Sequence, residues 1–502
     1  MPGRCIIRKP LRKWILLAAA LLSALGYALL RPARVELPAP CARLLAASEG
    51  LDAYEVTASL DAGARTLSVT QTMRLKNRAG ETLPDVVVRT FAGAYASEDT
   101  SPAATEELYD ACYPDGFSAG DIALFGVWWN GTIVETAFDD DARTVLRVPV
   151  GAWAAGDAAT LEMRYVLTIP ECAHRFGVSG GVWRLGNCLP VLSLYENGAW
   201  RTDAYCPVGD PFVSGCANWR VTLRVPEGFV CAGSADGRAT TAEGYTTYAF
   251  EALAARDFAL AVSDRYVSRS AMQGNVKIAC FCENAADAGR VIGYAQKAVA
   301  CYEKRYGEYP YQQLSLAAVD FPFGGMEYPG LIFFSQAYLA KDYQDTLELV
   351  VAHEAAHQWF YALVGSDQFN QPWQDEALCE YAVLRYVSDV YGQSASRRLY
   401  EQRVETAMRV TVLKGVTPGS PIDYFSDLSE YTTVVYNRGA ALLEALRLLL
   451  GEDALDGFLR AYCERFAYGY ASRADFERTL HETTGVDASA LLLDYLDTYI
   501  QN

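Results

Sequence analysis

Residues 349–360 read LVVAHEAAHQWF, an apolar stretch that contains two histidines and a glutamate. His353 and His357 are four residues apart, so on a helix they lie one turn apart on the same face and can bind one metal ion together. Glu354 follows the first histidine, where a carboxylate can act as general base on a water molecule. Eighteen residues separate His357 from Glu376, which is placed as a third ligand. Two histidines and one carboxylate leave a fourth position open, which is typical of a catalytic zinc site.

The HExxH pattern also occurs by chance, and a helix can bury two histidines simply for packing. However, the chain has only four histidines in 502 residues, and two of them fall in this pattern. In an apolar stretch, uncompensated histidine and glutamate side chains would be costly to bury. The sequence therefore predicts one Zn²⁺ ion bound by His353, His357 and Glu376.

The composition is that of a large globular protein. At 502 residues the chain is too long for one ordinary core, so two or three domains are expected. The formal net charge is −18, from 61 acidic and 43 basic residues. Such a surface repels nucleic acid, so no nucleic-acid partner is expected, and it tolerates cationic ligands such as peptide amino termini. The same charge also keeps a protein soluble, so it identifies no ligand by itself.

Trp14–Leu30 is an apolar run of 17 residues with basic residues on both sides, at the short limit for a membrane span. Leu30-Arg31-Pro32 follows without an A-x-A cleavage pattern, which favours an uncleaved signal anchor over a cleaved signal peptide. Five basic residues precede the run and two follow it closely, so we expect a cytoplasmic N-terminus and an outward-facing catalytic domain. Secretion after signal cleavage is the alternative.

Cysteines give less guidance than their number suggests. Of the thirteen, Cys5 precedes the apolar run, and the other twelve show no compact disulfide framework. Cys280 and Cys282 alternate along an apparent strand and would share one face. The sequence leaves their redox state and pairing open.

Sequence patterns change along the chain and predict four parts. Strand-like alternation and turn signals such as Asn130-Gly131 indicate an antiparallel β-domain, whereas helical periodicity dominates later. Helices are expected at 346–363, 373–390 and 394–413. The predicted parts are a basic segment with signal anchor (1–30), a linker (31–48), the N-terminal β-domain (49–268) and the mainly helical catalytic domain (269–502).

GGMEY at 324–328 precedes HEAAHQWF with its distant glutamate, and VVYNRGA follows at 434–440. In this order the three motifs resemble the aminopeptidase N family of gluzincin zinc metallopeptidases. GGMEY is similar to the family's exopeptidase motif GAMEN, and VVYNRGA is similar to the segment with the catalytic tyrosine. Residues 146–170 and 200–212 also resemble the family's β-domain. The resemblance implies an α+β fold, in which a saddle-like β-domain precedes a thermolysin-like, mainly helical domain.

The resemblance also implies roles for individual residues. Glu354 would activate the water, and Tyr436 would stabilise the oxyanion, with Tyr431 as the competing candidate. Glu327 would receive the α-ammonium of the substrate. Asp375 and Glu380, which flank the third ligand, would support the ligands or lie on the helix surface. The substrate backbone would be bound next to Glu327 by Gly324, Gly325 and Met326.

The sequence departs from the family pattern in two places. Tyr328 replaces the usual asparagine after the Met-Glu pair, and we find no match for the glutamine that the family's β-domain usually adds to the amine site. Only 145 residues follow His357, so we expect a short form without the long C-terminal helical domain of larger members, and a more open cleft.

The expected function is that of a zinc aminopeptidase acting on peptides with a free N-terminus. One alternative is a zinc endopeptidase with an open cleft. Another is a non-catalytic peptide-binding relative, although the intact ligands, base and tyrosine argue against it.

Overall fold

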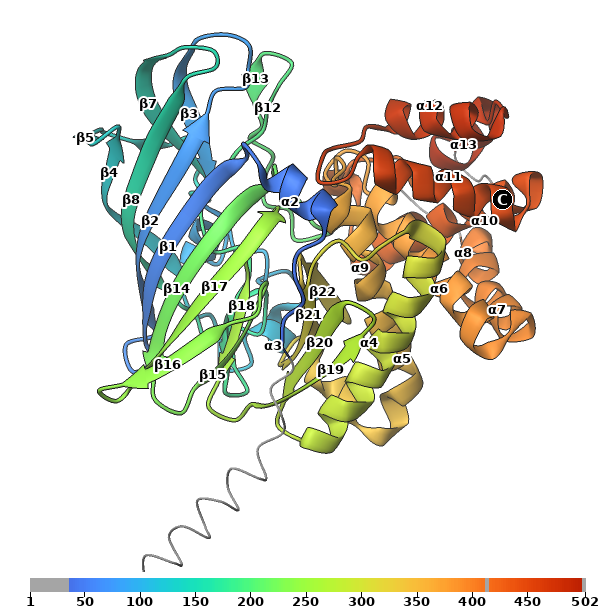
Figure 1. Ribbon diagram of the computed structural model, residues 1–502, viewed down its shortest axis with the longest axis horizontal. Helices are drawn as coiled ribbons and strands as arrows, with labels where there is room; N and C mark the ends of the chain where they lie inside the picture. The colour runs from blue at the N-terminus through green and yellow to red at the C-terminus, as the bar shows by residue number, and fades with distance from the viewer. Residues whose placement is uncertain (1–35, 411–414, 499–502) are drawn as a thin grey trace, which may run out of the picture. The chain divides into compact units, whose positions relative to one another are not determined.

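The computed structural model describes residues 36–410 and 415–498, and the chain from Leu37 onward forms one compact unit (Figure 1). The predicted membrane span at Trp14–Leu30 lies outside the described residues. Among the helices of the described part, none is both long and apolar enough to cross a membrane.

The first half of the compact unit is built from strands. Buried and solvent-facing side chains alternate along its longest strands, because successive residues of a strand point to opposite faces. Its eight-stranded sheet contains, in spatial order, β16 (Arg238–Ala242), β17 (Tyr245–Ala255), β14 (Ala217–Pro226), β1 (Asp52–Asp61), β2 (Thr66–Lys76), β8 (Ala158–Thr168), β4 (Asp121–Trp129) and β5 (Thr132–Ile133). The buried side chains of this sheet join one apolar core that includes Met73, Tyr165 and Trp219.

One pair of strands in this sheet corrects the prediction of an antiparallel domain. β1 and β14 are parallel, with Asp52 opposite Ala217 and Ser59 opposite Arg224. The other strand pairs of the sheet are antiparallel. Parallel neighbours need a long connection, and β14 pairs with β1 only after the chain has left and re-entered the sheet. Alternation along a strand carries no information about the direction of its partner, so the sequence could not reveal this pair.

Two four-stranded sheets, a hairpin and a short helix complete the strand-rich half. One sheet has the order β15 (Val230–Gly233), β18 (Leu260–Ser263), β10 (Val182–Leu185) and β9 (Phe176–Ser179). The other has the order β11 (Val191–Leu192), β3 (Leu83–Arg89), β7 (Val145–Trp153) and β6 (Ala137–Phe138). The hairpin pairs β12 (Tyr195–Glu196) with β13 (Ala199–Trp200), and the helix is α3 (Tyr109–Cys112).

The second half combines a five-stranded sheet with helices. The strand order is β19 (Val267–Gln273), β20 (Val276–Cys282), β21 (Gln313–Val319), β23 (Leu331–Ser335) and β22 (Gly325–Tyr328), so β22 is an edge strand. The longer helices are α4 (Ala285–Tyr306), α5 (Gln344–Ala356), α6 (Trp373–Tyr391), α10 (Gly439–Leu450), α11 (Glu452–Arg465) and α12 (Arg473–Thr484). The shorter ones are α7 (Gln393–Tyr400), α8 (Thr406–Arg409), α9 (Leu428–Tyr431) and α13 (Ser489–Leu496). A further short helix, α2 (Ala42–Ser48), precedes β1 and contacts β17.

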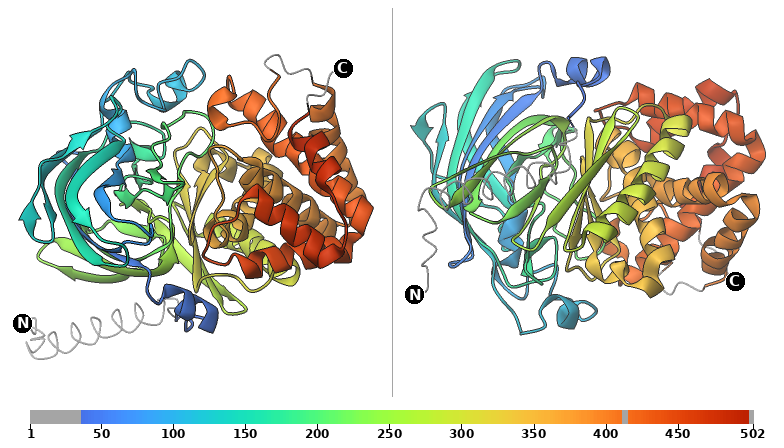
Figure 2. Two further views of the ribbon diagram at one scale, coloured as in Figure 1. Left: turned by 90° about the horizontal axis from the view of Figure 1, so that it is seen from above. Right: turned by 60° about the horizontal axis from the view of Figure 1, so that its bottom comes forward.

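Helices cover one side of the five-stranded sheet and hold the metal-site motif. α4 contacts β19 and β20, and α5 contacts β22 and β23. Figure 2 shows α10–α13, in orange and red, on the side of the helices that faces away from the strand-rich half. α4 is capped at its start by Asn284, whose side chain accepts a hydrogen bond from the Ala286 N–H, and at its end by Gly307, where φ is 103°.

The helix that carries the HExxH motif is shorter than predicted. α5 ends at Ala356, and the following π-helical segment Gln358–Leu363 is broken at Phe360 and Tyr361, where φ of Tyr361 is 154°. Arg256 from the strand-rich half donates a hydrogen bond from Nε to the carbonyl oxygen of Tyr361 at 2.9 Å. This contact between the two halves stabilises the kink. Arg256 and Tyr361 are 105 residues apart in the sequence, so helical periodicity could not predict the contact.

Candidate active site

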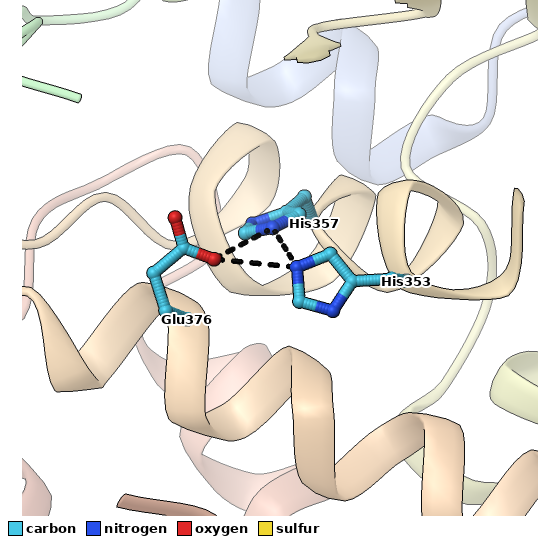
Figure 3. A group of neighbouring side chains, drawn as sticks. All are labelled: His353, His357 and Glu376. Carbon is cyan, nitrogen blue, oxygen red and sulfur yellow. Dashed lines mark hydrogen bonds and ion pairs between the residues drawn. The ribbon is translucent and has the colours of Figure 1, made fainter. Parts of the chain in front are cut away.

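The two motif histidines and Glu376 converge on one point (Figure 3). His353 lies on α5, His357 follows the end of that helix, and Glu376 lies in the first turn of α6. The Nε2 atoms of the two histidines are 3.1 Å apart. Oε2 of Glu376 lies 3.2 Å from Nε2 of His353 and 3.4 Å from Nε2 of His357. Three potential ligand atoms therefore face one another at nearly equal distances.

These three atoms fit a zinc ion in both geometry and chemistry. Zinc ligands lie about 2.0–2.1 Å from the metal, so neighbouring ligands of a tetrahedral ion are about 3.3–3.4 Å apart. The observed separations of 3.1–3.4 Å are close to that edge length. Burial opposes the charge on Glu376, but hydrogen bonds to the two histidines outweigh it and lower its pKa to about 2. The carboxylate is therefore ionised, as a metal ligand must be.

Carboxylates also hold the far side of each imidazole ring. Nδ1 of His357 lies 2.6 Å from Oδ1 of Asp375, and Nδ1 of His353 lies 3.6 Å from Oε2 of Glu380. A carboxylate at Nδ1 fixes the tautomer and directs Nε2 toward the metal. Of the two interpretations that the sequence left open for Asp375 and Glu380, the structure supports contact with the ligands.

Glu354 lies beside the ligands and needs a glycine opposite it. Its side chain is buried, and Oε2 has no hydrogen-bond partner among the described residues. A Cβ atom at Gly325 would lie only 2.5 Å from Oε1 of Glu354, so any side chain there would displace the carboxylate. Burial raises the pKa of Glu354 to about 7, which suits a general base near neutral pH.

Glu327 lies on the edge strand β22, next to Glu354 and His357. Carboxylate oxygens of both glutamates and a ring nitrogen of His357 all lie within 4.8 Å of one another. The Glu327 side chain is buried, and its Oε1 has no partner among the described residues. Burial raises the pKa of Glu327 well above its usual value. A buried carboxylate without a partner is costly, so a cationic ligand would stabilise it here.

The neighbours of Glu327 in the GGMEY motif take different positions. Gly324 and Gly325 line the cavity at the metal-ligand set, whereas the Met326 sulfur accepts a hydrogen bond from Nε of Arg175 at 3.2 Å. The Tyr328 hydroxyl donates to Oδ1 of Asn187 in the strand-rich half, at 3.1 Å. Tyr328 therefore packs between the two halves of the unit, in place of the usual asparagine.

The two candidate tyrosines lie side by side at the cavity wall. The ring of Tyr436 stacks on His353, with centroids 5.4 Å apart and an interplanar angle of 11°. Tyr431 packs edge-on against Tyr436 at 5.6 Å and is the more deeply buried of the two. Burial raises the pKa of Tyr436 well above its usual value, so the hydroxyl stays protonated and can donate a hydrogen bond. Direct contact with a metal ligand favours Tyr436 as the oxyanion donor.

Asp210 and Arg175 are site residues that the sequence did not reveal. Nη2 of Arg175 donates to Oδ1 of Asp210 at 2.7 Å, and both side chains are almost fully buried. Carboxylate oxygens of Asp210, Glu327 and Glu376 lie within 4.8 Å of one another. Asp210 falls within 200–212, a segment that resembles the family's β-domain, but no local signal places this segment against the GGMEY motif.

Residues from both halves of the compact unit line one open cavity of about 390 Å³. Its acidic side chains include Asp210, Glu327 and Glu354. Apolar side chains from Phe323, Leu349, Val350 and Leu428 form other parts of the wall. The size and the mixed lining are typical of a small-molecule or peptide-binding site.

Comparison with known proteins relates the chain to one peptidase family. Residues 291–497 match the model of the peptidase family M1 domain. Aminopeptidase N from Lactobacillus helveticus is 31% identical over 223 residues, which is 41% of this chain and 26% of that protein. Mouse aminopeptidase B is 27% identical over 335 residues, which is 61% of this chain and 49% of that protein. The chain thus spans about a quarter to a half of the length of these relatives.

The fold is shared with a solved structure over most of both chains. The M1 zinc metallopeptidase from Deinococcus radiodurans has a TM-score of 0.63 and 18% identity, and the match covers 89% of this chain and 93% of that chain. Its fold therefore matches the combination of a strand-rich half and a helical half seen here. These findings confirm the resemblance indicated by the three motifs: residues 291–497 match the peptidase family M1 domain, and the curated relatives include aminopeptidase N and aminopeptidase B.

Proposed function

We propose that the protein is a zinc-dependent aminopeptidase that removes N-terminal residues from peptides. The observation that carries the proposal is the buried carboxylate of Glu327, which lacks a partner among the described residues and lies beside a three-ligand metal set. The names of the curated relatives, aminopeptidase N and aminopeptidase B, support the proposal. So does a mutant of the Deinococcus radiodurans enzyme, whose structure is described as bound to a Tyr-Ser-Ala substrate.

The residues of the site divide the chemistry among them. Zinc held by His353, His357 and Glu376 would supply Lewis acidity to the carbonyl and acidify a water molecule. Glu354 accepts the proton of the attacking water and delivers it to the departing amine. The neutral hydroxyl of Tyr436 donates a hydrogen bond to the oxyanion that develops on the scissile carbonyl.

The position of cleavage follows from the anchoring of the substrate's amino terminus. The α-ammonium pairs with Glu327, and Asp210 lies close enough to share its charge. The free edge of β22 can pair with the substrate backbone, because an edge strand presents unpaired N–H and C=O groups. Only the first peptide bond then lies at the metal site, so a single residue is released.

Blocking the amino terminus separates this function from the endopeptidase alternative. We expect the protein to cleave a fluorogenic peptide with a free amine and to leave its N-acetylated form intact. Glu354→Gln should abolish turnover, and Glu327→Ala should greatly reduce cleavage of the free-amine peptide. Equal cleavage of the acetylated peptide, unchanged in Glu327→Ala, would instead establish an endopeptidase. A zinc-loaded protein that cleaves neither peptide would leave only the non-catalytic relative.

We also propose that the N-terminal segment anchors the protein in a membrane as a single-pass signal anchor, with the catalytic part outside. The apolar run Trp14–Leu30 and the excess of basic residues before it support this orientation. The full chain expressed in its host should resist extraction by alkaline carbonate, and its catalytic part should be digested by protease added outside. Release into the medium after loss of residues 1–30 would favour secretion instead.

We further propose that the chain divides into an N-terminal β-domain (49–268) and a catalytic domain (269–502). The eight-stranded sheet would then form the saddle-like domain of the family. The last strand of the strand-rich half ends at Ser263, and the five-stranded sheet begins at Val267, which supports a boundary near 268. α2 (Ala42–Ser48) lies inside the predicted linker 31–48. Limited proteolysis should therefore cut before α2 more readily than between the two halves.

A further inference from the structure

The cavity is lined by carboxylates, Asp210, Glu327, Glu354 and Glu380, and by two arginines, Arg175 and Arg403. Its carboxylates Glu327 and Asp210 are grouped with His357 and Glu376. A cationic side chain, Arg403, also lines the cavity. Arg403 contacts Glu380, which belongs to none of the close carboxylate and histidine groups around Glu327. Arg175 pairs with Asp210 beside Glu327, whereas Arg403 pairs with Glu380 at the Nδ1 side of His353.

Arg403 is held in a defined place relative to the metal site. It lies in the π-helical segment Glu401–Glu405, between α7 and α8. Its Nη1 donates to Oε1 and Oε2 of Glu380, at 2.8 and 3.2 Å. Glu380 in turn lies 3.6 Å from Nδ1 of His353. The guanidinium group thus approaches the site from the outer side of His353, away from the ammonium anchors.

Much of the hydrogen-bonding capacity of Arg403 is left for a ligand. Its side chain is 35% exposed, compared with 8% for Arg175, the other arginine of the cavity wall. Within residues 36–410 and 415–498, the hydrogen bonds and ion pairs of Arg403 involve Nη1 alone. Nε and Nη2 remain, and this edge of a guanidinium group binds a carboxylate through two parallel hydrogen bonds. Support of Glu380 needs Nη1 alone.

We propose that Arg403 receives the C-terminal carboxylate of a short peptide whose amino terminus is held by Glu327 and Asp210. The inference rests on the aminopeptidase function proposed above and adds a substrate class, namely peptides of two or three residues with a free carboxylate. A peptide that runs from the ammonium anchors past the metal ligands brings its C-terminal part toward the His353 side. Each further residue extends the chain by about 3.3–3.6 Å, so the carboxylate of a longer peptide passes beyond Arg403.

The test compares alanine peptides of two to five residues, each with a free carboxylate or a C-terminal amide and all with a free amine. For the wild-type protein we expect kcat/KM to favour the free carboxylate roughly tenfold at two or three residues, mainly through KM, as for a lost charge-assisted hydrogen bond. This preference should be absent at five residues. In Arg403→Gln the acid-to-amide ratio should fall to about one, and Arg403→Lys should restore it only in part.

The amide peptides act as an internal control for damage to the metal site. Loss of support for Glu380 and His353 would slow both peptide forms equally and leave the ratio unchanged. Arg409→Gln removes the same charge from α8, where Arg409 pairs with Glu405, and should keep the wild-type ratio. A ratio that is the same in wild type and Arg403→Gln would overturn the role of Arg403, while cleavage of the amides would still uphold the aminopeptidase function.

A binding measurement tests Arg403 without turnover. Titration calorimetry of trialanine and its amide with Glu354→Gln should show tighter binding of the acid, and the difference should vanish in Glu354→Gln/Arg403→Gln. Equal affinities in both backgrounds would contradict the proposal even if no peptide were cleaved.

Discussion

Replacing Gly325 by alanine tests how closely the edge strand and the general base are fitted together. The added Cβ would lie 2.5 Å from Oε1 and 2.6 Å from Cδ of Glu354. Non-bonded carbon contacts are normally about 3.5–4.0 Å, so the carboxylate must move by about 1 Å. A displacement of that size in a catalytic group costs about 100-fold in rate. We therefore expect kcat to fall about 100-fold, with zinc content unchanged because Glu354 is not one of the three ligands.

Gly293→Ala on α4 provides a glycine-to-alanine control away from the cavity. Its Cβ would meet no atom within 4 Å, so kcat should stay within a few-fold of wild type. Steady-state kinetics on a free-amine peptide and zinc content measured by atomic absorption give the two readouts. Wild-type kcat in Gly325→Ala, or an equal loss in both variants, would refute the argument that this glycine makes room for Glu354.

Three further predictions follow from other parts of the structure. Asp375→Ala should weaken zinc binding by about 10- to 100-fold, because His357 loses the carboxylate at Nδ1, and competition with a chromophoric chelator measures this; unchanged affinity would count against that support. Tyr436→Phe should lower kcat by about 100- to 1,000-fold without loss of zinc, whereas Tyr431→Phe should have a small effect; the reverse order would exchange their roles. Burial, partly offset by hydrogen bonds from Phe258 N–H and Asn187, raises the pKa of Asp257 to about 7. Because this folded-state pKa exceeds the unfolded value, Asp257 should reduce stability as pH rises from about 4 to 7, by on the order of 4 kcal/mol, and Asp257→Asn should show a flatter dependence of the unfolding free energy on pH.

The metal site could be predicted from the sequence because its determinants are local. His353 and His357 share a helix face whatever surrounds them, and Glu376 comes from the first turn of the next long helix. Those positions depend on helix geometry and short connections. The edge-strand position of Glu327 depends instead on the pairing of β22 with β23, which the sequence patterns did not indicate.

Contacts between distant segments could not be predicted in this way. Asp210 and Arg175 meet Glu327 only because the strand-rich half packs against the edge strand β22. The kink after α5 depends on Arg256, and the parallel pairing of β1 with β14 depends on the path of the chain between them. Each of these features is set by tertiary packing, which can override local periodicity and which local periodicity does not report.

Product analysis of one long peptide tests the central claim most directly. The zinc-loaded protein is incubated with an unblocked decapeptide, and samples taken over time are analysed by mass spectrometry. If the buried carboxylate of Glu327 anchors the amino terminus, the products should form a ladder that shortens by one residue at a time from the N-terminus. Internal fragments that appear first, with the N-terminal residue still in place, would contradict the account.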